Sequence, residues 1–82
     1  MNEFVVYILR SVHHQKTYVG YTSNLIQRFY SHNKLGIKGY TLRYRPWKVV
    51  HVEFFVTKTE AIQRERFLKS GKGRAWIKQH VL

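Results

Sequence analysis

The chain has 82 residues and carries 15 Lys and Arg against 4 Asp and Glu, a formal net charge of +11. A chain this short predicts one domain, residues 1–82, which buries only roughly 60–65% of its unfolded surface. Hydrophobic residues at 44% and aromatic residues at 16% exclude a disordered chain. The absence of cysteine excludes disulfides and a Cys-based zinc site.

The excess of positive charge predicts a polyanionic partner, because such a charge otherwise destabilises the compact state by self-repulsion. Nucleic acid is the partner that fits best. A membrane surface fits less well, since the basic residues are spread along the chain and not gathered on one amphipathic helix. The sequence has no run long enough to span a membrane and no signal-peptide pattern at its start, so we expect a cytoplasmic protein. A basic protein without a specific partner is the alternative.

The first half of the chain predicts a β-hairpin. Residues 4–9 are continuously apolar, which indicates a strand covered on both faces, and residues 17–22 have the composition of a second strand. Tyr7 and Tyr18 are then expected to face each other across these strands, on the same side of the sheet. Gly20 interrupts the second strand, which often marks a close approach by another backbone or a ligand.

A helix is predicted after the hairpin. Ser23 and Asn24 are favourable N-cap residues, and Gln27 completes a pattern similar to a capping box. Arg28 and His32 lie one turn apart along the border of the apolar stripe. That stripe is formed by Leu25, Ile26 and Phe29.

Residues 33–46 predict a long basic loop. Cations and tyrosines are mixed in this segment, and such a mixture is suited to contacts with phosphates and bases. The alternative is an ordinary solvated loop whose tyrosines pack on the core. The residues predicted to bind substrate, together with Gly20, are Lys34, Lys38, Tyr40, Arg43 and Arg45.

The second half of the chain predicts a third strand and two helices. Trp47–Phe55 alternates, with Val50, Val52 and Phe54 expected on one face. A capping box at residues 57–60 opens a helix that runs to residue 70 and is closed by Gly71. Residues 74–82 have the pattern of a short amphipathic helix. The expected fold class is therefore α+β, a three-stranded antiparallel sheet flanked by helices in the order β-β-α-β-α-α.

Glu65 lies within the apolar stripe of the helix over residues 57–70. A charge there is costly unless it is paired with a cation or a metal ion. Two explanations are open. Glu65 is either a metal ligand or the buried ion-pair partner of Arg28.

Several of these residues together resemble the GIY-YIG nuclease family. They are Val6-Tyr7-Ile8, Tyr18-Val19-Gly20, Arg28, His32 and Glu65. The resemblance covers essentially the whole chain, and residues 61–69, AIQRERFLK, are similar to the family's helix that bears a metal-binding glutamate. Residues 39–47 resemble those of small stand-alone bacterial members. The chain departs from the family pattern in the first triplet, where valines stand at positions 5 and 6.

The resemblance implies an endonuclease that hydrolyses DNA phosphodiester bonds with one divalent cation, Mg²⁺ or Mn²⁺, per site, on branched or damaged DNA in repair or recombination. By matching positions, Glu65 would ligate the metal and Arg28 would stabilise charge on the phosphate. Tyr18 would help to deprotonate the attacking water, assisted by Tyr7 and His32. Such a minimal domain is expected to be a monomer whose specificity is low or is supplied by a protein partner.

Two other functions are compatible with the sequence. A non-catalytic DNA- or RNA-binding domain would use the same fold with a vestigial site. An accessory module bound to a protein is the third possibility. Salt separates the last from the first two, because nucleic-acid affinity falls with a log–log slope of about −0.9 per phosphate contact on duplex DNA.

Overall fold

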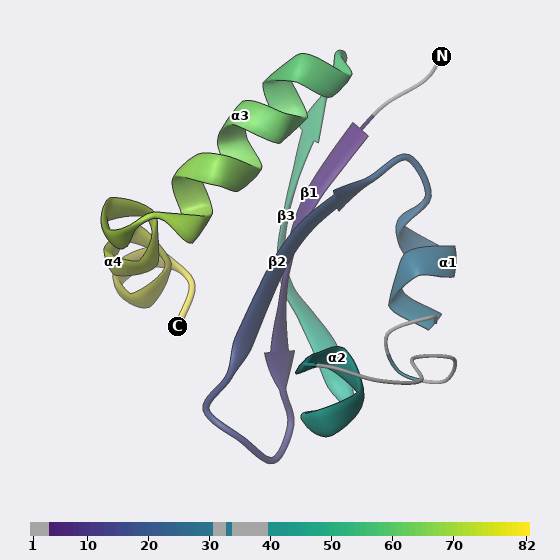
Figure 1. Ribbon diagram of the computed structural model, residues 1–82, viewed down its shortest axis with the longest axis vertical. Helices are drawn as coiled ribbons and strands as arrows, with labels where there is room; N and C mark the ends of the chain where they lie inside the picture. Colours follow the sequence, from purple (N-terminus) through teal and green to yellow (C-terminus); the bar gives the residue numbers. More distant parts are fainter. Residues whose placement is uncertain (1–3, 31–32, 34–39) are drawn as a thin grey trace.

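The structure, a computed structural model, describes residues 4–30, 33 and 40–82. It contains the predicted order of three strands and three helices, with a one-turn helix added before the third strand (Figure 1). In chain order the elements are β1 (Phe4–Ser11), β2 (Thr17–Thr22), α1 (Leu25–Tyr30), α2 (Tyr40–Arg43), β3 (Trp47–Phe55), α3 (Lys58–Lys69) and α4 (Gly71–His80).

The three strands form one antiparallel sheet in the order β2-β1-β3. Helices α3 and α4 lie on one side of the sheet and α1 and α2 on the other (Figure 1). β1 is the central strand, and its residues 5–9 are all buried, as predicted from the continuous apolar run. A strand sandwiched between two helical layers needs apolar residues on both faces, which explains why this segment does not alternate.

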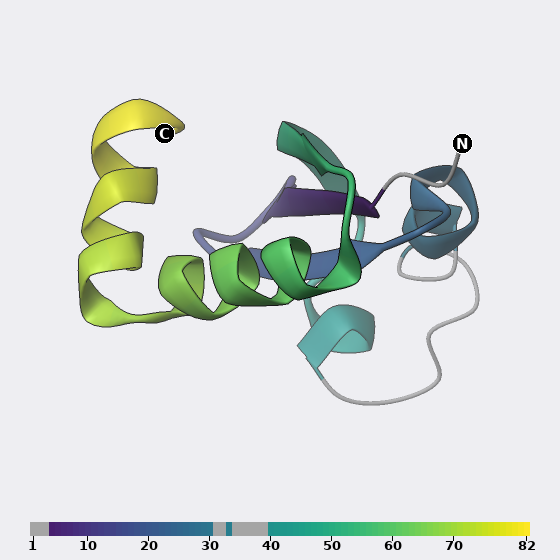
Figure 2. The same cartoon turned by 90° about the horizontal axis from the view of Figure 1, so that it is seen from above.

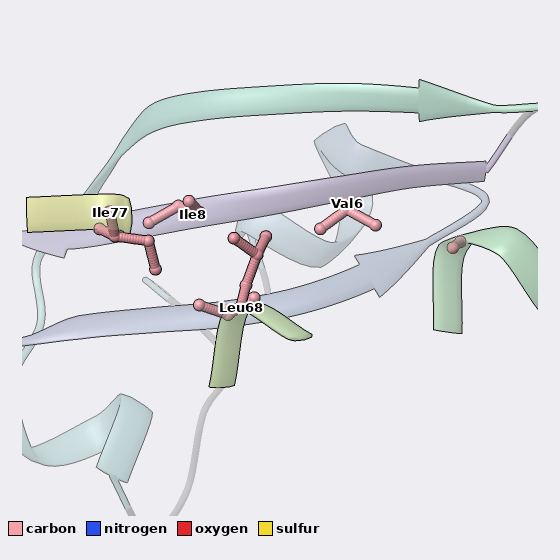
Figure 3. Close-up of a cluster of buried hydrophobic side chains, with 6 residues drawn as sticks. Val6, Ile8, Leu68 and Ile77 are labelled. Carbon is pink, nitrogen blue, oxygen red and sulfur yellow. The ribbon is translucent and has the colours of Figure 1, made fainter. Parts of the chain in front are cut away.

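Two hydrophobic clusters therefore share β1. On the α3 and α4 side, Val6 and Ile8 pack with Leu68 and Ile77 (Figure 3). On the other side, Val5, Tyr7 and Leu9 pack with Trp47, and residues of α1 cover them. The buried residues of the cluster on the α3 and α4 side are Val6, Ile8, Val19, Ala61, Leu68 and Ile77. Those of the cluster on the α1 side are Val5, Tyr7, Leu9 and Trp47.

The alternation predicted for β3 is wrong at Val50. The register with β1 shifts between Ile8, which pairs with His51, and Leu9, which pairs with Val49. Val50 is the extra residue of this bulge and packs against the α3 side, whereas Val52 packs on the α1 side. An extra residue in one strand reverses the facing of the residues beyond it, a change that hydrophobicity alone does not reveal.

Helix α1 begins as predicted but buries fewer residues than expected. The side-chain oxygen of Asn24 accepts a hydrogen bond from the Gln27 N–H at 3.1 Å, so Asn24 is the N-cap. The Asn24 N–H itself donates to Thr22 Oγ1 at 3.0 Å and not to Gln27. Ile26 is 84% exposed, so the predicted apolar stripe is reduced to Leu25 and Phe29.

Helices α3 and α4 come directly one after the other in the chain. Thr57 and Glu60 form the predicted capping box of α3. Gly71 does not close that helix; it is the first residue of α4, whose N-cap is Ser70. The chain turns sharply between the two helices, so that α4 runs in a direction across that of α3 (Figure 2). Gly73 makes the turn possible, since a Cβ at that position would lie 1.9 Å from the Phe67 carbonyl oxygen.

The predicted loop over residues 33–46 is partly helical, because α2 occupies four of its residues. Asn33 is held against the start of β3: its side-chain amide donates to the Trp47 carbonyl at 3.0 Å and accepts from the Trp47 N–H at 2.5 Å. Lys34 and Lys38 lie outside the described residues. Within the described part of the chain, no helix combines the length and apolar character needed to cross a membrane.

Candidate active site

A surface cavity of about 520 Å³ lies at the outer edge of β2. Strand β2 forms one edge of the sheet, so side chains from both faces can reach this cavity around it. Figure 1 shows β2 running between α3 and α1. The lining residues are Phe4, Tyr7, Tyr18, Gly20, Tyr21, Thr22, Ser23, Arg28, Lys58 and Glu65. Four of the five predicted catalytic residues therefore meet in one place; the fifth, His32, lies outside the described residues.

Tyr7 and Tyr18 form a stacked pair on the α1 side of the sheet. Their ring centroids are 6.2 Å apart with an angle of 28° between the planes. The two residues are diagonal neighbours and not directly opposite as predicted, since Tyr7 pairs with Gly20 and Tyr18 pairs with Leu9. The Tyr18 ring also packs edge-on against the Trp47 ring, with 6.4 Å between the ring centroids. Trp47 is buried, so this contact holds the Tyr18 ring against the core.

Gly20 makes room for a side chain of the protein itself. A Cβ at this position would lie 2.5 Å from the Tyr7 phenol oxygen and 2.7 Å from its Cζ. The close approach predicted at Gly20 is therefore real, but its partner is Tyr7. The missing side chain lets the phenol of a central strand pass over the edge strand and reach the cavity.

The ring and hydroxyl of Tyr7 are almost completely buried, with 1% of the residue exposed. Burial raises the pKa of Tyr7 well above the ordinary tyrosine value, and the neighbouring Tyr18 and Glu65 raise it further, while Arg28 opposes them. Tyr7 therefore keeps its proton at neutral pH and is able to donate a hydrogen bond. The expected assistance of Tyr7 to Tyr18 in deprotonating the attacking water stays a prediction.

Glu65 reaches the cavity from α3, on the other side of the sheet. Its side chain is 17% exposed, in keeping with its predicted place in the apolar stripe. Among the described residues it pairs with Lys69, one turn along the helix, with 3.4 Å between Lys69 Nζ and Glu65 Oε2. The ion pair with Arg28 that the sequence left open does not form among the described residues; Glu65 pairs with Lys69 in its place. Part of the cost of placing this carboxylate near the core is thus met locally.

Two cations line the same cavity as this carboxylate. Arg28 lies on α1 with its side chain exposed, and Lys58 lies in the first turn of α3. Sequence reasoning did not single out Lys58. A signal was present, because Lys58 and Glu65 are seven residues apart and so share one face of α3.

Of the predicted substrate-binding residues other than Gly20, two have described side chains, Arg43 and Arg45, and neither lines this cavity. Arg43 is the last residue of α2, and Arg45 lies between α2 and β3. The Arg43 guanidinium stacks over the Tyr44 ring at 5.5 Å, and Tyr44 packs against the core cluster on that side. The side chain of Tyr40 is not among those described. For Tyr44, the alternative of a tyrosine packed on the core is confirmed.

The donor groups of the cavity limit which metal ion it could hold. The described residues contain no cluster of three or more His, Cys, Asp or Glu that could enclose a metal. A single, mostly buried carboxylate next to an open cavity fits a hydrated hard cation, because Mg²⁺ is often held by one or two carboxylates and completes its shell with water and phosphate oxygens. Glu65 is the residue able to hold it.

Fold and cavity together define a small basic α+β domain with a carboxylate, Glu65, in a cavity at the edge of its sheet. Residues 3–79 match the family model described as the GIY-YIG catalytic domain. This protein therefore belongs to the GIY-YIG family.

Relatives of known sequence and structure agree with that family. UPF0213 protein OB0043 of Oceanobacillus iheyensis is 41% identical over 64 residues, which cover 78% of this chain and 73% of the relative. UPF0213 protein CPE1444 of Clostridium perfringens is also 41% identical over 64 residues, 78% of this chain and 68% of the relative. The solution NMR structure of UPF0213 protein BH0048 from Bacillus halodurans aligns with a TM-score of 0.56 at 24% identity, over 94% of this chain and 83% of the other. The last comparison supports the fold.

Proposed function

We propose that this protein is a metal-dependent endonuclease that hydrolyses phosphodiester bonds of DNA, including branched or damaged DNA. One observation carries the proposal: Glu65, Arg28, Tyr7 and Tyr18, from elements on both sides of the sheet, line one surface cavity. A basic domain that only binds nucleic acid has no use for a carboxylate with 17% exposure at that point. The net charge of +11 supports a polyanionic substrate.

A divalent cation bound at Glu65 would polarise the phosphoryl oxygen and lower the pKa of a bound water. Arg28 is assigned to the substrate phosphate. Its guanidinium is always charged and can fork onto two phosphate oxygens, so it stabilises the extra negative charge of the transition state. The exposure of Arg28 leaves it free to swing onto the substrate.

The two tyrosines take different roles. Tyr18 is assigned to the attacking water and helps to pass its proton to solvent as the water oxygen bonds to phosphorus. The bond from phosphorus to the leaving oxygen breaks, and that oxygen takes up a proton from solvent. Burial favours the protonated form of Tyr7, and its phenol, which lies over Gly20 and lines the cavity, is assigned to donate a hydrogen bond to the substrate. Tyr7 therefore orients its neighbour and the substrate and does not exchange a proton.

The Glu65–Lys69 ion pair favours a second candidate function. A carboxylate that is already paired needs no metal, and the domain would then bind nucleic acid without cutting it. The two functions make the same prediction for binding and opposite predictions for cleavage.

The test is cleavage of labelled single-stranded, duplex, nicked and branched DNA, and of RNA, with Mg²⁺ or Mn²⁺ and with chelator. We expect cleavage by the wild type only with metal, and at least a thousandfold loss in Glu65→Gln. The matched control is Glu60→Gln, which removes the same charge from the same helix while glutamine can still form the capping box. Equal binding by all three proteins without any cleavage would overturn the nuclease and establish the binding domain.

A further inference from the structure

A second surface cavity, of about 360 Å³, lies between β2 and the junction of α3 with α4. Its floor is apolar and buried, formed by Val19, Leu68 and Ile77. Figure 3 shows Leu68 and Ile77 in the same buried cluster as Val6 and Ile8. Its rim is polar, formed by Thr17, Lys69 and Arg74, of which the two cations are exposed.

This second cavity adjoins the candidate active site. Tyr18 lines both cavities. Lys69, on the rim of the second cavity, is the ion-pair partner of Glu65 in the first. Along β2, Thr17 and Gly20 are three residues apart, which is about 10 Å of extended chain.

The two cavities are thus separated by a distance that a nucleic-acid strand can bridge in a few units. A strand in a duplex advances about 3.4 Å along its axis per nucleotide, so a bond cleaved near Gly20 lies two or three nucleotides from Thr17. A strand that runs along the edge of β2 from the first cavity meets Lys69 first and Arg74 next.

The chemistry of the second cavity matches a nucleotide. Phosphate requires cationic donors, which Lys69 and Arg74 supply, and Arg can contact two phosphate oxygens at once. Sugar and base present apolar surface, which the floor of Val19, Leu68 and Ile77 can cover. No acidic residue lines this cavity among the described residues, and a metal ion would find no carboxylate in it.

We propose that the second cavity is a substrate subsite that holds a nucleotide two or three positions from the cleaved bond, with its phosphate on Lys69 and Arg74. The subsite rests on the proposed function for the position of the cleaved bond. It would fix the register of the strand, so that the bond to be cut lies at Glu65 and Arg28. Lys69, which bridges the two cavities, would couple them.

Arg74→Gln is the variant that tests the subsite, because Arg74 does not contact Glu65. Lys72→Gln is its control: it removes one positive charge two residues away, about 160° around α4 at 3.6 residues per turn. Binding of a short single-stranded oligonucleotide is measured by fluorescence anisotropy with chelator, over a series of salt concentrations. The wild type and the two variants are then compared on oligonucleotides that carry a neutral methylphosphonate at one position at a time.

In Arg74→Gln we expect the log–log salt slope to fall by about 0.7, which is one phosphate contact on a single strand, and in Lys72→Gln we expect the wild-type slope. One methylphosphonate position should weaken wild-type binding and leave Arg74→Gln unaffected. Equal slopes and equal methylphosphonate patterns in the two variants would overturn the subsite. Since all of these measurements are made without turnover, they stand even where no DNA is cut, and the nuclease is tested separately by Glu65→Gln.

Discussion

The phenol of Tyr7 occupies the space that a side chain at Gly20 would fill: a Cβ there would lie 2.5 Å from the Tyr7 oxygen. Tyr7 belongs to the buried central strand and Gly20 to the edge strand that pairs with it. The contact joins the hydrophobic core to the candidate active-site cavity. It also means that Tyr7 can take this position only while residue 20 has no side chain, whatever substrate is bound.

Gly20→Ala is therefore expected to destabilise the fold and to displace the Tyr7 ring from the cavity. The ring can move only by disturbing the core, because it is 1% exposed and packed against Val5, Leu9 and Trp47. Overpacking of this kind costs about 1–3 kcal/mol of unfolding free energy. Urea denaturation measures that cost, and DNA cleavage measures the effect on the site.

Gly71→Ala is the matched control for this prediction. A Cβ at Gly71 would have no atom within 4 Å, and the residue lies in the first turn of α4. We expect unchanged cleavage and an unfolding free energy equal to the wild-type value or up to about 1 kcal/mol higher. Equal losses in the two variants would show that the contact with Tyr7 is not the cause.

Tyr7→Phe removes the phenol and keeps the ring. Because burial raises the pKa of Tyr7 well above its usual value, the group does not titrate near neutral pH. We expect cleavage to fall by about a hundredfold, the effect of losing one donor at a reacting phosphate, while the pH–rate profile keeps its shape. Tyr30→Phe, which alters a half-exposed tyrosine of α1, should leave the rate unchanged. A basic limb that disappears only in Tyr7→Phe would contradict this role.

Local patterns predicted the elements of this fold, because each is encoded by neighbouring residues. The apolar run of β1, the N-cap Asn24 and the capping box of α3 act within a few residues of themselves. The errors arise where a distant segment decides. Ile26 is exposed although its spacing fits the stripe, and Val50 changes face because the pairing with β1 inserts a bulge.

The same distinction holds for the site. The anomaly of Glu65 was visible from its place in an apolar stripe, and the tyrosines, Arg28 and Glu65 line one cavity. The ion-pair partner of Glu65 was not predictable by that argument, since Arg28 and Lys69 are both available cations and only the packing of α1 and α3 chooses between them. The second cavity was not predictable from the sequence. In the sequence, Val19, Leu68 and Ile77 have only the character of core residues, and Arg74 has only that of an exposed charge.

Asn33 fixes the entry to β3 through both backbone groups of Trp47. Asn33→Ala is expected to lower the free energy of unfolding by about 1–3 kcal/mol, because it leaves a partly buried N–H and a carbonyl without these partners. Asn33→Asp keeps the acceptor and loses the donor, and should fall between alanine and wild type at neutral pH. Thermal unfolding monitored by circular dichroism gives the order of the three proteins. An alanine variant as stable as wild type would show that water replaces both bonds at no cost.

A fork of hydrogen bonds joins α3 to β3, the edge strand opposite the β2 edge that lines the candidate active site. Arg64 donates to both carboxylate oxygens of Glu53, at 2.7 and 3.0 Å, and His51 Nε2 lies 2.9 Å from the same carboxylate. The Arg64 guanidinium also lies over the Trp76 ring, 4.8 Å from its centroid, so the fork reaches α4. Burial alone would raise the pKa of Glu53, but the bonds from Arg64 and His51 outweigh it and hold that pKa below its usual value.

The stability supplied by Glu53 should therefore depend on pH. A carboxyl group whose pKa is lowered by folding contributes its full stabilisation above the pKa of the unfolded chain, and that contribution is lost as the pH falls through the lowered folded value. Glu53→Gln is expected to cost about 1.5–3 kcal/mol at pH 7, where charge-assisted bonds are lost, and the difference from wild type should shrink steadily below about pH 4.5. Arg64→Lys, which keeps the charge without the fork, should show a smaller cost with the same pH trend. Urea denaturation between about pH 3 and pH 7 measures both, and a wild-type advantage that stays constant over this range would mean that packing, and not the carboxylate charge, holds β3 to α3.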